Sequence, residues 1–277
     1  MEHTVNAKKQ ALHLHSIANA RELGGYKTSD GKTVRQGKLL RSGALTNASQ
    51  EDLAVLTEQY RLSVIVDMRA SYEVASDPEP KVEGVRLYHC KIMDEKLMEK
   101  RIGGITDILM DASVDHITKM TALLKSGVVS EKMYIEFLQC QTGKEGYRDF
   151  FSVLLDAPEQ SAVLWHCTHG KDRTGVAAML LLGALNVDEE TIMEDFLLTN
   201  VFFEEKIIAM RKQLEAYIQD QALHEEILVI DRGVCASYMQ NAIRFIKENY
   251  GDIKGYVKTE LGLGEPDIAR LCRLYTE

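Results

Sequence analysis

The chain has 277 residues, of which 45% are hydrophobic and 27% charged, and its formal net charge at pH 7 is −9. This composition is typical of a globular protein with one large domain or two small ones, and the acidic balance argues against a nucleic-acid-binding protein. The five cysteines include no C-x-x-C pair, so we expect free thiols in a reducing compartment.

The first residues, MEHTVNAKKQ, lack the apolar core of a signal peptide. The sequence also lacks a run of about 18 apolar residues that would span a membrane. We therefore expect a cytoplasmic protein with no stable membrane insertion, while secretion by a non-classical route stays open. The oligomeric state cannot be inferred from these features.

Short alternating segments and turns occupy residues 11–45, and the SDGK stretch at 29–32 predicts a hairpin. Residues 47–60 read as a helix that begins with a capping box, because Ser49 lies three residues before Asp52. Two apolar stretches after this helix predict buried strands, at 62–68 and 85–93.

Residues 95–145 show no strand pattern and combine Met-rich helical pieces with Gly-Gly and Ser-Gly breaks. We expect a helical insertion or lid here, within a single domain that covers residues 1–277. Apolar residues at helical spacing fit a packed core, and they also fit a lid over an apolar ligand.

The second half of the chain predicts a helix at 146–158, a strand at 161–167 and a helix at 174–186. Asp188 is a candidate N-cap for the next helix. Further helices are predicted at 201–221 and 236–251, with Gly251 as the stop of the second, followed by two short pieces. Strands separated by helices favour an α/β fold with a mostly parallel central sheet flanked by helices.

The sequence HCTHGKDRTG lies between the predicted strand and helix at 166–175. Ligands of parallel sheets bind at this place, where the amides of a curled loop and a helix N-terminus attract an anion. Glycine permits a tight turn, and the arginine fork can bind two phosphate oxygens at once. We therefore expect a phosphoryl group to bind Thr168, His169, Gly170, Lys171, Asp172 and Arg173.

Cys167 lies at the centre of this loop, where the helix N-terminus and nearby cations favour a thiolate. A thiolate beneath a bound phosphate is a nucleophile directed at phosphorus, which predicts a phosphocysteine that water then hydrolyses. Arg173 and the amides would stabilise the charge in both steps. Thr174 could donate a hydrogen bond to the sulfur, and His166 is expected to point into the fold and orient the loop.

Three other interpretations of the loop stay open at this point. Cysteine is often buried and inert. His166, Cys167 and His169 could bind a metal, although adjacent His and Cys side chains do not readily face one ion. Sulfur transfer by a rhodanese-like domain also uses a cysteine in an anion-binding loop, but such loops are typically one residue shorter.

The loop resembles the Cys-x5-Arg signature of protein tyrosine phosphatases, and its Lys-Asp pair resembles the bacterial branch that contains the mycobacterial secreted tyrosine phosphatase B. Other motifs of that branch are matched in order along nearly the whole chain. These are NARELGGY (19–26), GKLLRSGAL (37–45), VDMRASYE (66–73), DFLLTN (195–200) and ENYGDIKGYV (248–257). Residues 95–145 are the main stretch without a clear match.

The resemblance implies a cysteine-phosphatase fold, no metal or other cofactor, and hydrolysis of phosphotyrosine in proteins. It extends to phosphoserine, phosphothreonine and phosphoinositides, for which Lys171 would add a cation beside the loop. A dedicated phosphoinositide phosphatase and a catalytically silent phosphate-binding module are the alternatives to a tyrosine phosphatase.

Two aspartates are candidates for the general acid, since the chain contains no WPD motif. Asp172 lies inside the loop, next to Arg173, and is the preferred choice. Asp94 follows the strand at 85–93, so a parallel sheet would deliver it to the same edge, and it matches an aspartate of the family.

Other charged residues lie at the end of the strand at 62–68 and earlier in the chain. We expect Asp67 and Arg69 to form a buried pair that braces the phosphate loop. Arg21 and Arg41 are interpreted mainly as solvated surface charges, with a role near the site or on the substrate as the alternative.

Overall fold

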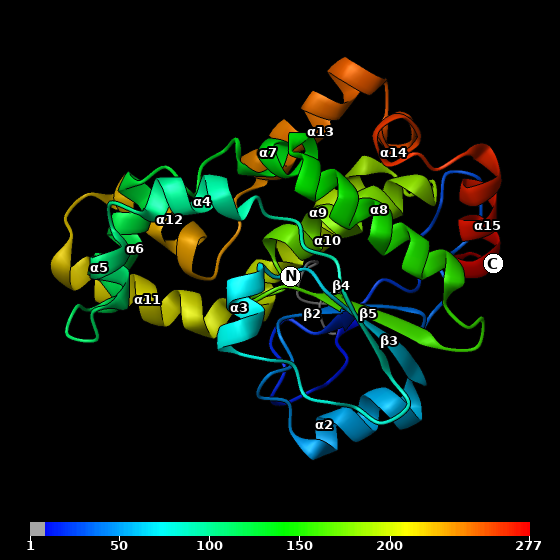
Figure 1. Ribbon diagram of the computed structural model, residues 1–277, viewed down its shortest axis with the longest axis horizontal. Coiled ribbons are helices and arrows are strands. Elements are labelled where there is room, and N and C mark those ends of the chain that lie inside the picture. Colours follow the sequence, from blue (N-terminus) through cyan, green and yellow to red (C-terminus); the bar gives the residue numbers. More distant parts are fainter. Residues whose placement is uncertain (1–8) are drawn as a thin grey trace.

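The computed structural model describes residues 9–277, so most of the N-terminal stretch without a signal-peptide core lies outside the described residues. Five strands form one sheet in the order β1-β2-β5-β3-β4 (Figure 1). Their bounds are Arg21–Glu22 for β1, Leu39–Ser42 for β2, Leu62–Asp67 for β3, Arg86–His89 for β4 and Ala162–His166 for β5. Only β1 is antiparallel to its neighbour. The prediction of an α/β fold with a mostly parallel sheet is confirmed.

Strand β5 lies between β2 and β3, and all five of its residues are buried. Val163 and Trp165 pack into the larger hydrophobic core on one face of the sheet. Ala162 and Leu164 pack into a smaller core on the other face. This burial on both faces explains the continuous apolar run in the sequence, because a central parallel strand has no solvated side.

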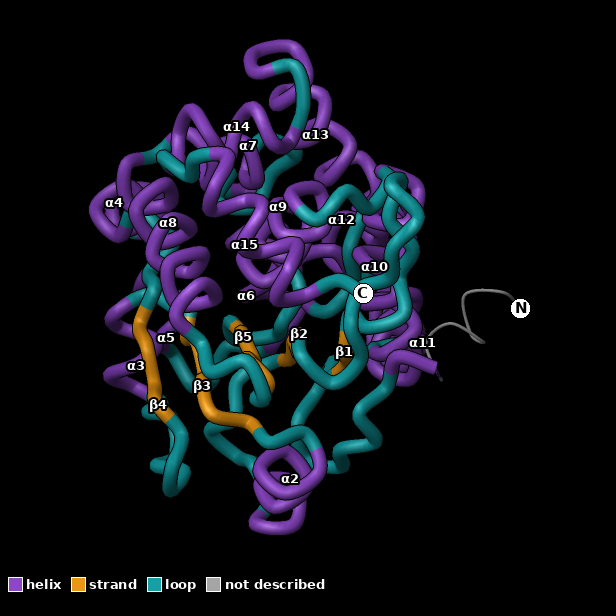
Figure 2. The backbone as a smooth tube through the Cα atoms, turned by 90° about the vertical axis from the view of Figure 1, so that its right-hand side faces the viewer, coloured by secondary structure: helices purple, strands orange, loops and turns teal. Residues whose placement is uncertain are grey.

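Helices cover both faces of the sheet (Figure 2). On the face of the smaller core lie α2 (Gln50–Ala54) and the π-helical turn η1 (Val55–Gln59). The larger core is covered by helices that carry most of the buried aromatic and aliphatic side chains. They are α7 (Met133–Gln139), α8 (Gln141–Asp156), α9 (Asp172–Ala184), α10 (Glu189–Phe202), α13 (Ala236–Tyr250), α14 (Ile253–Leu261) and α15 (Glu265–Tyr275).

A group of helices projects from the body beside the short helix α3 (Ser71–Ser76), and we call it the arm (Figure 1). The arm consists of α4 (Glu95–Ile102), α5 (Thr106–Met110), α6 (His116–Lys125), α11 (Glu204–Tyr217) and α12 (Gln221–Asp231). Its small core is formed by Met210, Leu214, Ile227 and Leu228. Within residues 9–277, no helix combines the length and the apolar character needed to cross a bilayer.

Several local predictions differ from the structure. The turn at residues 29–32 does join two short paired segments, because an antiparallel bridge connects Lys27 with Thr33 and backbone hydrogen bonds connect residues 25–28 with 32–34. The pairing is too short to form two strands. Ser49 does cap α2 by accepting from the Asp52 N–H, but the Asp52 carboxylate accepts from His15 and Ser16, so the capping box is only half formed.

Several elements were not predicted, β1 and α3 among them. Strand β2 lies in a segment that reads as turns, and its four residues are all buried beside β5. The predicted helix at 201–221 is divided in the structure, because α10 extends to Phe202 and α11 (Glu204–Tyr217) ends before Asp220. Asp220 caps α12 by accepting from the Ala222 and Leu223 N–H groups.

Candidate active site

The loop between β5 and α9 lies at the carboxyl edge of the sheet. His166 ends β5, in register with Ser42 of β2 and Asp67 of β3. Gly170 has φ +67°, and a Cβ there would lie 2.2 Å from the Ser42 carbonyl oxygen. Only glycine fits this approach, so the loop curls tightly against β2 before α9 begins.

Cys167 lies at the base of this loop, and its residue is only 2% exposed. The sulfur is within electrostatic reach of three cationic side chains, those of Arg41, Lys171 and Arg173. The residue also contacts the larger hydrophobic core. The thiol is therefore buried, with three cationic side chains near it.

Arg173 is held by a carboxylate that sequence analysis assigned no role. Its Nη1 lies 2.5 Å from Glu73 Oε2 and its Nη2 lies 3.0 Å from Glu73 Oε1. The Thr168 hydroxyl also donates to Glu73. Burial would raise the pKa of Glu73, but the charge and hydrogen bonds of Arg173 outweigh it and lower the pKa to about 2. The guanidinium is thus fixed at the rim of the loop.

The two candidate acids reach the same cavity from different elements. Asp172 begins α9, its side chain is 24% exposed, and Tyr134 Oη of α7 donates to its Oδ1 at 2.6 Å. Asp94 is the N-cap of α4 and accepts from the Leu97 N–H at 3.1 Å. Tyr134 lies in the stretch without a clear family match, so no sequence signal pointed to it.

Lys171 and His169 differ in where they point. The Lys171 ammonium donates to the carbonyls of Val229, Ile230 and Gly233, at 2.6, 3.1 and 3.2 Å. These three bonds use all of its donors, so Lys171 ties the loop to the C-terminal end of α12. His169 lines the cavity, and burial followed by the nearby charge of Arg232 lowers its pKa to about 3.

Arg21 and Arg41 are not solvated charges, because both are fully buried. Arg21 Nε lies 3.0 Å from Asp195 Oδ1, and Arg41 Nη1 lies 2.5 Å from Asp195 Oδ2. Arg41 Nη2 then donates to the Gly170 carbonyl at 2.9 Å. Asn19 adds hydrogen bonds to the carbonyls of His169 and Gly170. Asp195, which belongs to the DFLLTN motif, is the carboxylate that pairs with both arginines. We call Arg21, Arg41 and Asp195 the buried brace.

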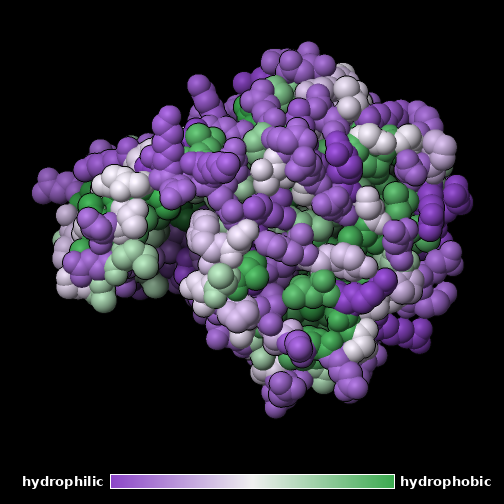
Figure 3. All heavy atoms as spheres, in the orientation of Figure 1, coloured by the Kyte–Doolittle hydropathy of each residue, from purple (hydrophilic) through white to green (hydrophobic). Residues whose placement is uncertain are grey.

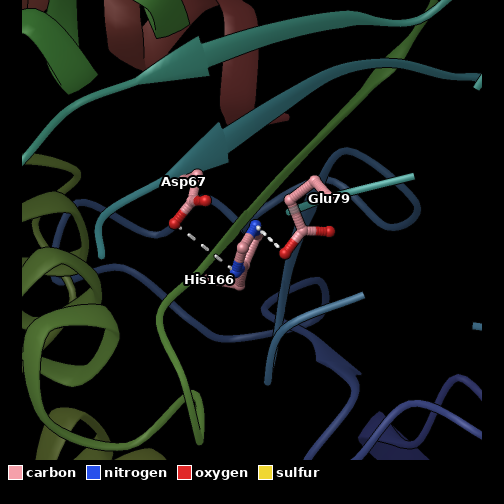
Figure 4. Close-up of side chains that lie close together, drawn as sticks. All are labelled: Asp67, Glu79 and His166. Carbon is pink, nitrogen blue, oxygen red and sulfur yellow. Dashed lines mark ion pairs between the residues drawn. The ribbon is translucent and has the colours of Figure 1, made fainter. Parts of the chain in front are cut away.

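Asp67 and Arg69 form a buried bidentate pair beneath the loop, with Nε–Oδ1 at 3.0 Å and Nη2–Oδ2 at 2.8 Å. Figure 4 shows Asp67 and Glu79 on either side of the His166 ring. Asp67, Glu79 and His166 offer ligand atoms within 4.8 Å of one another, a spacing that a metal ion could use. Here Arg69 lies 2.8 Å from Asp67 and 3.0 Å from Glu79, so a guanidinium already supplies the positive charge.

Thr174 is buried in the first turn of α9, and its backbone carbonyl accepts from Trp165 Nε1 at 3.2 Å. Its hydroxyl has no hydrogen-bond partner among residues 9–277. A buried hydroxyl without a partner is uncommon, and this one belongs to the residue directly after Arg173.

A cavity of about 470 Å³ opens above Arg173. Its polar floor is formed by Glu73, Thr168, His169, Asp172 and Arg173. Its walls are mostly apolar and come from the arm and α7, with Met93, Leu97, Met98, Met120, Leu123, Val128, Met133 and Phe137 among them. Figure 3 shows apolar side chains among polar ones on the arm. The arrangement can bind an anion at the floor and an apolar or aromatic group above it.

Comparison with known proteins agrees with this geometry. Residues 12–277 match the tyrosine phosphatase family. This chain belongs to that family. It is 30% identical over 261 residues to a protein of Cupriavidus necator named as a tyrosine-protein phosphatase, a match that covers 94% of this chain and 86% of the relative.

Two further relatives are more distant. The triple specificity protein phosphatase PtpB of Mycobacterium tuberculosis is 26% identical over 265 residues, which covers 86% of this chain and 90% of PtpB. A tyrosine-protein phosphatase of Nostoc commune is 26% identical over 166 residues, covering 58% and 47% of the two chains. The enzyme class is therefore that of a phosphoric monoester hydrolase, which acts on phosphorylated substrates. The resemblance inferred from the motifs is confirmed.

Proposed function

We propose that this enzyme hydrolyses phosphotyrosine in proteins through a covalent phosphocysteine on Cys167. The observation that carries the proposal is the position of this buried thiol, at the base of a glycine-curled loop whose arginine is locked at the rim. The loop amides and the N-terminus of α9 favour a bound dianion above the sulfur.

In the first step the Cys167 thiolate attacks phosphorus and the bond from phosphorus to the tyrosine oxygen breaks. Asp172 gives a proton to the leaving phenolate, and the guanidinium of Arg173 binds the equatorial oxygens. In the second step Asp172 takes a proton from water, the water oxygen attacks phosphorus and the sulfur–phosphorus bond breaks. The Thr174 hydroxyl, which is buried and has no hydrogen-bond partner among the described residues, would donate to the departing sulfur.

Asp172 is the preferred acid because it lines the cavity floor beside Arg173, and Tyr134 fixes its carboxyl group. Asp94 lines the same cavity, but its carboxylate already caps α4. We assign Asp94 an auxiliary role at the entrance of the cavity.

The helices of residues 95–145 would act as the lid over the substrate. Their apolar side chains form the upper walls of the cavity, which suits an aromatic phosphoester. PtpB is named a triple specificity phosphatase, and hydrolysis of phosphoserine and phosphothreonine is a secondary part of this proposal.

Phosphoinositide hydrolysis has weaker support. The loop lysine that would bind a second phosphate is engaged by three backbone carbonyls, as described for Lys171. A peptide substrate needs no such second cation.

The test is steady-state hydrolysis of a phosphotyrosine peptide, a phosphoserine peptide and phosphoinositides by wild type and Cys167→Ser, with and without chelator. We expect the phosphotyrosine peptide to have the highest kcat/KM and Cys167→Ser to abolish turnover, with no effect of chelator. A preference for phosphoinositides would support the dedicated lipid phosphatase, and inactivity on every substrate would support a silent phosphate-binding module.

A further inference from the structure

A buried group of ionisable side chains lies directly behind the catalytic loop. Glu79 comes from the turn-rich stretch between α3 and β4, and its side chain is 1% exposed. His166 Nε2 lies 3.4 Å from Glu79 Oε1 and has no hydrogen-bond partner among the described residues. Arg69 Nη2 lies 3.0 Å from the same carboxyl oxygen.

The tautomer of His166 follows from its other nitrogen. Nδ1 lies 3.3 Å from the Cys167 carbonyl oxygen. A carbonyl oxygen can only accept, so Nδ1 carries a hydrogen and donates. In a neutral imidazole Nε2 is then a bare lone pair, and it faces a carboxyl oxygen. Two acceptors in contact inside the protein repel each other, unless a proton lies between them.

The charge balance of the group leads to the same result. Arg69 contacts both Asp67 and Glu79, so its single positive charge offsets only one of these two carboxylates and leaves the excess negative charge with the Glu79–His166 pair. With one additional proton this pair is neutral or zwitterionic, and without it a buried carboxylate remains uncompensated.

We infer that Glu79 shares a proton with His166 and is a positioning residue for the nucleophile Cys167. Glu79 also accepts from the Leu45 N–H at about 3.2 Å, while the neighbouring Ala44 N–H donates to the carbonyl of Thr168. Glu79 therefore connects the segment that supports the loop with the histidine that precedes the nucleophile. The effect that we expect from Glu79 on enzyme activity rests on the proposed function.

The charged groups around the pair favour a proton on Glu79. Burial raises the pKa of Glu79 to about 7, with Arg69 opposing the rise and Asp67 and Asp77 adding to it. Burial lowers the pKa of His166 to about 4, with Asp67 opposing the fall and Arg69 and Arg173 adding to it. As the pH rises through about 7, Glu79 would lose its proton to solvent. The Nδ1 bond to Cys167 would then weaken, and a negative charge would appear behind a loop that binds an anion.

The experiment compares pH profiles of kcat/KM for wild type, Glu79→Gln and the control Glu83→Gln, an exposed residue of the same stretch. A glutamine side chain is close in shape to glutamate and stays neutral at every pH, so Glu79→Gln should lack the decline above about pH 7 that wild type shows. For each protein we divide kcat/KM at about pH 8.5 by kcat/KM at about pH 6. We expect this ratio to be roughly three- to tenfold higher for Glu79→Gln than for wild type. Glu83→Gln should follow wild type, and identical profiles for all three proteins would overturn the inference.

A second measurement uses the wild-type protein alone and does not depend on its activity. Nitrogen-15 NMR of the wild-type protein reads the protonation of each nitrogen of His166 as the pH changes. We expect a hydrogen on Nδ1 throughout and a shift of Nε2 as the pH passes about 7. A hydrogen on Nε2 with a bare Nδ1 would exclude the shared proton, even for a fully active phosphatase.

Discussion

The catalytic loop and the arm differ in how their side chains are held. Around the loop, Arg21, Arg41 and Asp195 are buried and paired with one another or with loop carbonyls. In the arm, helices α4, α5 and α6 contain no buried residue, and Met110 at the end of α5 is 80% exposed.

We relate this difference to two tasks of the proposed active site, which are the chemistry at phosphorus and the binding of the rest of the substrate. The chemistry requires donors held in fixed positions around the phosphoryl group, which a buried ionic network provides. Binding the rest of the substrate requires adaptable apolar contact, which methionine-rich helices with little burial provide. We therefore expect changes near the loop to act on kcat or stability, and changes in the arm to act on KM.

The largest effect is expected for Arg173→Lys, which keeps the positive charge but loses the planar fork. We predict that kcat/KM for a phosphotyrosine peptide falls about 10³-fold. Arg232→Lys is the matched control, because Arg232 lines the same cavity without contacting Glu73, and it should change kcat/KM only a few-fold. A loss of less than tenfold for Arg173→Lys would contradict the rigid-loop account.

The next effect distinguishes the two candidate acids. Asp172→Asn should lower kcat about 10²-fold for a phosphotyrosine peptide, whose leaving group needs a proton. The loss should be much smaller for p-nitrophenyl phosphate, whose leaving group departs as an anion. Asp94→Asn should show neither loss, and the reverse pattern in a steady-state assay of both variants would assign the acid to Asp94.

Asp195→Asn tests the buried brace through stability. Removing one charge leaves two buried guanidinium groups without a counter-ion, so we predict a loss of about 3 kcal/mol at pH 7 in urea denaturation. Burial raises the pKa of Asp195, but Arg21 and Arg41 outweigh it, so the folded-state pKa lies below the unfolded one. The stability that this carboxylate contributes is present above the unfolded pKa of about 4 and is lost as the pH falls through the folded pKa.

The difference in stability between wild type and Asp195→Asn should therefore shrink on acidification. The neighbouring Glu194→Gln is the control and should change stability by less than about 1 kcal/mol. A constant difference from neutral to acid pH would show that the charge of Asp195 does not act through the two arginines.

The smallest effect is expected in the arm. Leu97 and Met98 line the cavity from α4 without belonging to a hydrophobic core. The double variant Leu97→Ser and Met98→Ser should raise KM for a phosphotyrosine peptide about three- to tenfold and leave kcat nearly unchanged. Lys100→Ser on the same helix is the control, since Lys100 is exposed. A fall in kcat without a change in KM would show that the arm takes part in the chemistry.

The strand, loop and helix that contain the proposed catalytic residues could be predicted because these residues are contiguous in the sequence. One strand, ten residues and one helix contain the thiol, the turn glycine and the arginine, and the flanking apolar runs identify the strand and the helix. The strands β3 and β5 were predictable for the same local reason, since burial on both faces of a parallel sheet leaves a short apolar run. The prediction of a buried strand at 85–93 was wrong about burial, because β4 lies at the edge of the sheet and three of its four residues are exposed.

The partners of these residues could not be predicted, because they come from distant parts of the chain. Glu73 is 100 residues from Arg173, and Tyr134 is 38 residues from Asp172. Glu73 and Asp195 belong to motifs that match the family, but a motif does not say which residue its carboxylate pairs with. Tyr134 belongs to no matched motif, and an arginine is interpreted as a surface charge until its counter-ion is known. Arg21 and Arg41 were misread in this way, and the partner that corrects the interpretation, Asp195, is 174 residues from Arg21.

The most direct test of the covalent mechanism is rapid-quench trapping of the enzyme during turnover of a phosphotyrosine peptide labelled with radioactive phosphate. We predict covalent label on the peptide that contains Cys167 in the wild-type enzyme, with no label in Cys167→Ser. Turnover by wild type with no labelled cysteine at any quench time, or undiminished turnover by Cys167→Ser, would contradict the account.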